Sequence, residues 1–106
     1  MATSELQVAI RRRPGAPVLE LIGDIDAGAD GALQDAWAEA ADDASELVLD
    51  FTRTTYINSS GIAVIVQLLA NARARGITLT ARGLTPHYRE IFEITRLSDF
   101  MLIADA

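Results

Sequence analysis

Apolar and polar residues alternate over residues 5–12 and again over residues 17–23, and a period of two is typical of half-buried strands. Between these segments the residues RRPGAP supply the proline and glycine of a chain reversal, so we predict a first hairpin. Residues 46–51 (ELVLDF) are short, apolar and rich in β-favouring side chains, which predicts a central strand covered on both faces. Residues 77–81 and about 100–103 predict two further strands.

The first helical pattern follows the residues GDID. Its apolar side chains recur at the spacing of one helix face and are Leu33, Ala36, Trp37 and Ala40. Asp26 is placed to cap the N-terminus of this helix, and Asp30 falls in its first turn, where a carboxylate is favourable.

Two more helices are predicted downstream. One runs from Ser60 to about Arg75 and is ended by Gly76 in the manner of a C-terminal glycine. Its apolar stripe is wide: Ile62, Ile65, Leu69 and Ala72 mark one face, which Val64, Val66 and Leu68 broaden. The other begins at Thr85 and Pro86, a capping hydroxyl and a proline in the first turn. Its expected packing residues are Tyr88, Ile91, Phe92 and Thr95.

The order of these elements is β-β-α-β-α-β-α-β. Helices that connect parallel strands must lie on the faces of a sheet, so the order predicts a mixed β-sheet with helices packed against it. The chain has 106 residues, enough for one modest core. We therefore expect a single α/β domain over residues 1–106.

Charge and composition exclude several classes of protein. The formal net charge is -6, which opposes nucleic acid, and the one basic cluster, Arg11–Arg13, looks like the solvated end of a strand. An acidic surface instead suits docking to a basic face of a protein partner. The longest apolar run, Ile62–Val66, is far too short to span a bilayer. With no cysteine and no recognisable secretory signal, we expect a soluble cytoplasmic protein.

The candidate chemistry lies at a strand-to-helix corner, TTYINSSGIAVIV, residues 54–66. A nucleophilic hydrolase is not expected, because the corner lacks the first glycine of G-x-S-x-G and His87 is the only histidine. One histidine and no cysteine leave only scattered carboxylates as metal ligands. The sequence has no lysine and so no P-loop. We expect neither an enzyme nor a cofactor.

Two interpretations of this corner remain. Asn58, Ser59 and Ser60 can each cap the following helix by accepting a hydrogen bond from its backbone N–H groups. Alternatively, a phosphoryl group on Ser59 would sit at the positive end of the helix dipole and would add about -1.5 to -2 charge. A partner docked at the corner would then meet new repulsion.

Three segments of the sequence resemble the STAS domains of anti-sigma factor antagonists. LVLDFTRTTYINSSGIAVIVQLL is similar to the family's central strand, D-S-S-G-[LI] turn and apolar helix. LELIGDIDAGADGAL is similar to its G-E-[IL]-D stretch, and LTPHYREIFEITRLSDF to its closing helix. The resemblance implies a non-enzymatic switch. An anti-sigma factor that is itself a serine kinase phosphorylates the first serine of the turn, a phosphatase restores it, and the unphosphorylated antagonist sequesters the anti-sigma factor and so releases a sigma factor.

Carried over by position, the resemblance makes Ser59 the phosphate acceptor, with Ser60 and Gly61 completing the turn. Asp26 matches an acidic residue of the neighbouring loop that helps to form the partner surface. Asn58 departs from the family, which usually has aspartate there, so the strength of kinase recognition is open. We also expect Ile62 or Val66 to stay partly exposed for docking.

The same fold also serves other roles. Some STAS domains are interaction or scaffold modules of signalling assemblies, and others are subunits of transport machinery, so a non-switching module is the alternative function. The sequence leaves open the sigma factor, the kinase, the phosphatase and the oligomeric state.

Overall fold

The structure is a computed structural model that describes residues 5–14 and 16–104; Gly15 of the predicted reversal lies outside this range. In chain order, its strands and α-helices are β1 (Gln7–Arg11), β2 (Val18–Ile25), α1 (Asp30–Ala40), β3 (Glu46–Asp50), β4 (Thr54–Ile57), α2 (Ser59–Arg75), β5 (Thr78–Arg82), α3 (Pro86–Ile94) and β6 (Leu102–Ile103). Two short 3₁₀ turns, η1 (Ala27–Ala29) and η2 (Leu97–Asp99), precede α1 and β6.

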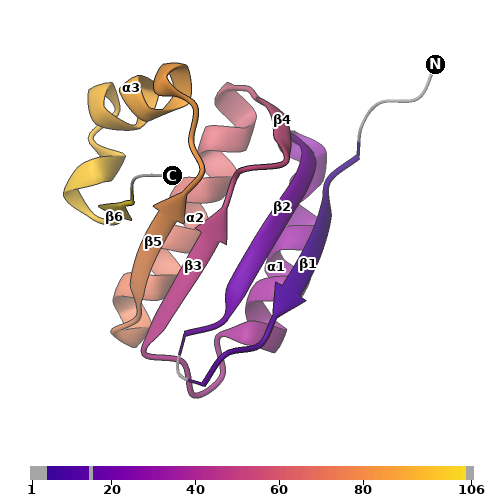
Figure 1. Cartoon of the computed structure of the whole chain (residues 1–106), viewed down its shortest axis with the longest axis vertical. Coiled ribbons are helices and arrows are strands. Elements are labelled where there is room, and N and C mark those ends of the chain that lie inside the picture. Colours follow the sequence, from indigo (N-terminus) through magenta and orange to yellow (C-terminus); the bar gives the residue numbers. More distant parts are fainter. Residues whose placement is uncertain (1–4, 15, 105–106) are drawn as a thin grey trace.

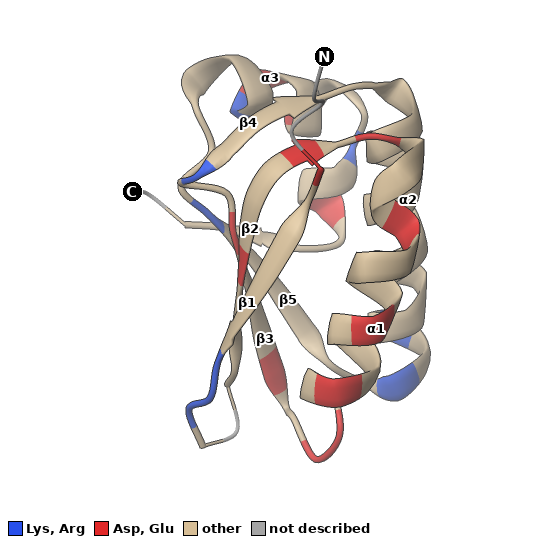
Figure 2. Ribbon diagram, turned by 90° about the vertical axis from the view of Figure 1, so that its right-hand side faces the viewer, with Lys and Arg blue, Asp and Glu red and all other residues tan. Residues whose placement is uncertain are grey.

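The described strands form one mixed sheet in the order β1-β2-β3-β5-β6, and β4 pairs with β2 beyond the end of β3. β1 and β2 are antiparallel, and every other pair is parallel. α1 and α2 lie side by side on one face of the sheet, and α3 lies beyond the carboxyl end of β5 (Figures 1 and 2). The predicted α/β fold with a mixed sheet is confirmed.

Three details differ from the prediction. Residues 54–57 form an additional strand, β4, because pairing with β2 extends a segment too short to be recognised alone. The helices α1 and α2 cover only one face of β3, and its residues alternate between the core and the other face, so the expectation of a strand covered on both faces is wrong. Thr95 is exposed and ends α3, where its hydroxyl donates to the Ile91 carbonyl, so it is not a packing residue.

The core lies between the sheet and the two helices. Buried side chains of β2 and β3, such as Leu21 and Leu49, face the predicted stripe of α1, all of which is buried. On α2 the buried stripe is Gly61, Val64, Ile65, Leu68, Leu69 and Ala72. Ile62, expected near its centre, is only half-buried at its edge.

Asp50 is a buried carboxylate at the end of β3. It accepts hydrogen bonds from the backbone and hydroxyl of Thr52, at 2.9 and 2.6 Å, and from Arg82 on β5 at 2.9 Å. Burial by itself raises the pKa of Asp50, but the bonds from Thr52 and the Arg82 charge outweigh it, so the pKa lies below its ordinary value. The ionised form therefore ties β3 to β5 and to the loop that leads into β4.

Replacing Asp50 with asparagine should destabilise the protein most near neutral pH. Because the folded state lowers this pKa, the stabilisation is present above the ordinary carboxyl pKa of about 3.9 and disappears as pH falls through the lower folded value. We expect Asp50→Asn to lose about 1–3 kcal/mol of unfolding free energy at pH 7 and much less near pH 3, by urea denaturation. Asp35→Asn, on the exposed face of α1, is the control. A pH-independent difference would contradict the assignment.

Candidate functional site

Parallel pairing of β2 with β4 places two polar residues side by side. Ile25 pairs with Ile57 at the carboxyl ends of the two strands, and each strand turns into a helical segment at its next residue. Those residues are Asp26 and Asn58, two residues predicted from separate segments of the sequence. The N–H of Asn58 donates to the Ile25 carbonyl at 3.3 Å, which holds the two turns together.

Each of these residues caps the segment that follows it. A carboxylate oxygen of Asp26 accepts from the Gly28 N–H at 2.9 Å, and the side-chain oxygen of Asn58 accepts from the Gly61 N–H at 2.8 Å. Asp26 caps η1, which continues directly into α1, so its predicted capping role is confirmed one short turn earlier than expected. Both side chains are thus fixed by the first turns that they stabilise.

Gly61 lies where α2 meets the backbone of β2. A Cβ atom on this residue would stand 1.9 Å from the Ile25 carbonyl oxygen, a distance that no real contact allows. Gly61 is also buried in this structure. It has a packing role, because it lets the first turn of α2 approach β2 and holds the neighbouring serines in place; its predicted place in a partner surface stays a prediction.

Ser59 and Ser60 occupy the first two positions of α2, and both are exposed. Their backbone N–H groups have no acceptor inside the helix, as for the first residues of any α-helix. Since Asn58 supplies the cap, the prediction that Ser60 serves as a cap or turns into the fold is wrong. The corner therefore presents two accessible hydroxyls at the positive end of a helix of 17 residues.

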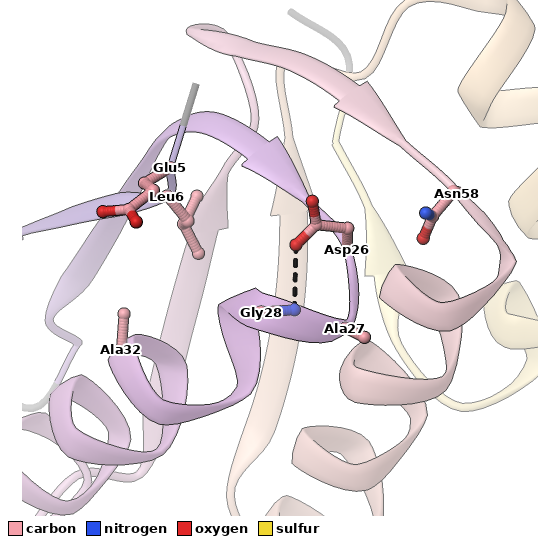
Figure 3. Close-up of a pocket in the computed structure, with 7 residues that line it drawn as sticks. All are labelled: Glu5, Leu6, Asp26, Ala27, Gly28, Ala32 and Asn58. Carbon is pink, nitrogen blue, oxygen red and sulfur yellow. Dashed lines mark hydrogen bonds between the residues drawn. The ribbon is translucent and has the colours of Figure 1, made fainter. Parts of the chain in front are cut away.

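A hollow of about 530 Å³ adjoins this corner (Figure 3). Asp26 and Asn58 border it on one side, and Glu5, Leu6 and Ala32 face them from the other (Figure 3). Its charged residues, Glu5 and Asp26, are both acidic. The surface beside Ser59 is therefore negative before any modification, which favours a basic partner.

The two predicted docking residues on α2 differ in exposure. Val66 is 45% exposed, whereas Ile62 is half-buried and packs against the core. The expectation that one of them stays accessible is confirmed for Val66. Whether either residue contacts a partner stays a prediction.

Two contacts near the corner were missed by sequence reasoning. The phenol oxygen of Tyr88, in the first turn of α3, accepts a hydrogen bond from the Ile57 N–H at 3.1 Å, on an edge of β4 that no other described strand covers. The Thr55 hydroxyl donates to Asp24 on β2. Both contacts join segments about 31 residues apart, so no local sequence pattern could have indicated them.

The described residues contain no group of three or more potential metal ligands. His87 is exposed, and its ring lies beside that of Tyr88, with 5.1 Å between the ring centroids. In the described part of the chain, no helix is sufficiently long and apolar to cross a membrane. What the corner offers chemically is an exposed hydroxyl in a fixed helical turn.

Comparison with known proteins gives a family match. A family model described as "Mlab, STAS domain" matches residues 8–104, which is most of the chain. A comparison with curated protein sequences finds no match.

Several solved structures share the fold. SpoIIAA, an anti-sigma factor antagonist, is 17% identical in its unphosphorylated form, with a TM-score of 0.72 over 95% of this chain and 88% of that chain. Its phosphorylated form from Bacillus is 19% identical, with a TM-score of 0.69 over 93% and 90%. An anti-sigma factor antagonist from Mycobacterium paratuberculosis is 23% identical, with a TM-score of 0.75 over 96% and 87%.

A sulfate transporter family protein from Wolinella succinogenes is also similar, at 15% identity and a TM-score of 0.72 over 84% of this chain and 73% of that chain. At these identities the likeness establishes a common fold, and the named proteins differ in function.

Replacing Gly61 with alanine should unfold or strongly loosen the corner. The added methyl group meets backbone rather than a flexible side chain, so we expect a loss of about 2 kcal/mol or more in unfolding free energy. Gly31→Ala is the matched control, because a Cβ at Gly31 in α1 meets nothing within 4 Å and alanine favours helix. Thermal and urea denaturation measure both variants; equal stability of Gly61→Ala and wild type would refute the packing role.

Proposed function

The chain belongs to the STAS domain family, and from this premise we propose that it is an anti-sigma factor antagonist switched by phosphorylation of Ser59. In its unphosphorylated form it binds an anti-sigma factor that is also a serine kinase, and so releases a sigma factor. A serine phosphatase reverses the modification. The domain is a phosphate acceptor and binding protein of the cytoplasm rather than an enzyme.

The observation that carries this proposal is the exposed Ser59 hydroxyl at the first position of a capped helix. The unbonded N–H groups and the dipole of α2 favour a phosphate there, so the modified turn can keep its helical structure. Asn58 and Gly61 hold that turn against β2 in either state. The switch therefore acts through the charge of the surface more than through refolding.

The charge of the phosphate determines which state of the protein binds the partner. Phosphate would add about -1.5 to -2 charge to a corner that already includes Asp26 and Glu5. A partner that docks there in the unmodified state must bury part of this surface. Added negative charge then raises the cost of desolvation and repels any acidic group of the partner.

The second candidate is a non-switching STAS module of a signalling or transport assembly. Two observations favour it: Asn58 stands where antagonists usually have aspartate, and the sulfate transporter family protein has a similar fold. In that case the same corner would bind a partner without being modified.

Phosphate incorporation should depend on Ser59. The purified protein is incubated with ATP and the serine kinase recovered with it from lysate, and phosphosites are read by mass spectrometry. Wild type and Ser60→Ala should incorporate about one phosphate per chain, and Ser59→Ala almost none, because both variants keep the Asn58 cap. Stoichiometric labelling of Ser59→Ala, with loss in Ser60→Ala, would place the acceptor at Ser60.

Partner affinity should fall when Ser59 is charged. We expect Ser59→Asp and authentic phosphoserine to weaken the complex by more than about 1 kcal/mol, and by less at high salt, which screens exposed charges. Asn58→Asp retains a capping oxygen and should change stability little, yet the double variant should lose more affinity than Ser59→Asp alone. Calorimetric titration at two salt concentrations measures all four proteins. Equal affinity of modified and unmodified chains would favour the scaffold.

A further inference from the structure

We propose that a second copy of this chain pairs antiparallel with the open edge of β1, about a two-fold axis through Ala9, so that the sheet continues across a dimer. This inference rests on β1 and α1 and does not depend on the proposed function. The relevant surface is the edge of the sheet opposite to β6 (Figure 1).

β1 is the longest uncovered edge among the described strands. It pairs with β2 alone over five residues in an uninterrupted register, so its outward N–H and C=O groups face no other described strand. The opposite edge, β6, has only two residues, and the edge of β4 is met by the Tyr88 phenol. The first four residues of β1, 7–10, contain no charge, proline or bulge, which are the usual protections of an edge strand, and the charge of its last residue, Arg11, is paired with Glu20.

The charges that flank β1 are complementary to those of a second, antiparallel copy. Arg11 and Arg12 already form ion pairs with Glu20 and Glu39 in the same chain. Among the described residues, no ion pair is formed by Glu5, before the strand, or by Arg13, after it. Pairing centred on Ala9 brings Glu5 opposite Arg13 of the second copy, twice per dimer and on the same face of the sheet.

The apolar side chains match in the same register. Val8 lies opposite Ile10 of the second copy, and both are half-buried in the monomer. They line a hollow of about 430 Å³ between β1 and α1, together with Leu6, Ala32 and Ala36, and the polar residues Gln7, Asp35 and Glu39 complete its lining. A second β1 would cover the open side of this hollow while its backbone completes the edge hydrogen bonds. A second copy is therefore the occupant to which hydrogen bonds, charge and apolar surface all point.

Sedimentation equilibrium of the full chain tests the dimer. A strand pair of this length buries little area, so we expect weak association, with the mass rising from one chain towards two between about 10 µM and about 1 mM. Arg13→Glu and Glu5→Arg each turn two attractive pairs into two repulsive ones and should raise the dimer Kd about tenfold. The double reversal restores both attractive pairs and should return Kd to within about threefold of wild type.

Arg75→Glu at the exposed end of α2 is the matched control, since it changes the net charge as Arg13→Glu does but lies on another element. It should leave the dimer Kd nearly unchanged, and thermal melts should show that every variant is folded. Amide hydrogen exchange gives a second readout: alternate amides of β1 should exchange more slowly as protein concentration rises. A single-chain mass at about 1 mM, or a double reversal that fails to restore the dimer, overturns the proposal.

Discussion

The first turn of α2 approaches the backbone of β2 more closely than any residue but glycine allows, and the candidate site depends on this contact. Gly61 removes the Cβ that would collide with the Ile25 carbonyl, and the Asn58 side chain then accepts from the Gly61 N–H. The two strands that precede the helices are paired at Ile25 and Ile57, so their capping residues lie together. The packing of one helix on one strand end thus fixes the place of Asp26, Asn58 and both serines.

This arrangement separates the rigid part of the corner from the accessible part. The cap and the glycine are engaged inside the turn, whereas Ser59 and Ser60 are exposed and neither supplies the cap that holds it. A modification of such a hydroxyl changes charge and shape without removing a structural bond. That property suits a binding surface that must be altered reversibly, and it also leaves a surface that an unmodified scaffold could use.

The sheet is covered unequally, and its uncovered parts are stabilised in different ways. On the face away from α1 and α2, Asp50 and Arg82 join neighbouring strands through a partly buried ion pair. The edge of β4 is closed by Tyr88 from α3, a helix whose buried residue Phe92 packs edge-on against Phe51. The edge of β1 has neither kind of cover in the described residues and, unlike the two-residue edge strand β6, is five residues long, so it is the place where another strand can add.

Local patterns in the sequence determined the helices, most strands and the residues of the corner. All four buried residues of α1 were predicted, because apolar side chains that recur every 3.6 residues show directly which face of a helix packs against the core. Tertiary structure decided the rest. β4 forms by pairing with β2, Asn58 and not Ser60 caps the helix whose first turn packs on Ile25 through Gly61, and Val66 is 45% exposed whereas Ile62 packs at the edge of the core. Each of these outcomes depends on contacts between segments distant in sequence, which no local pattern encodes.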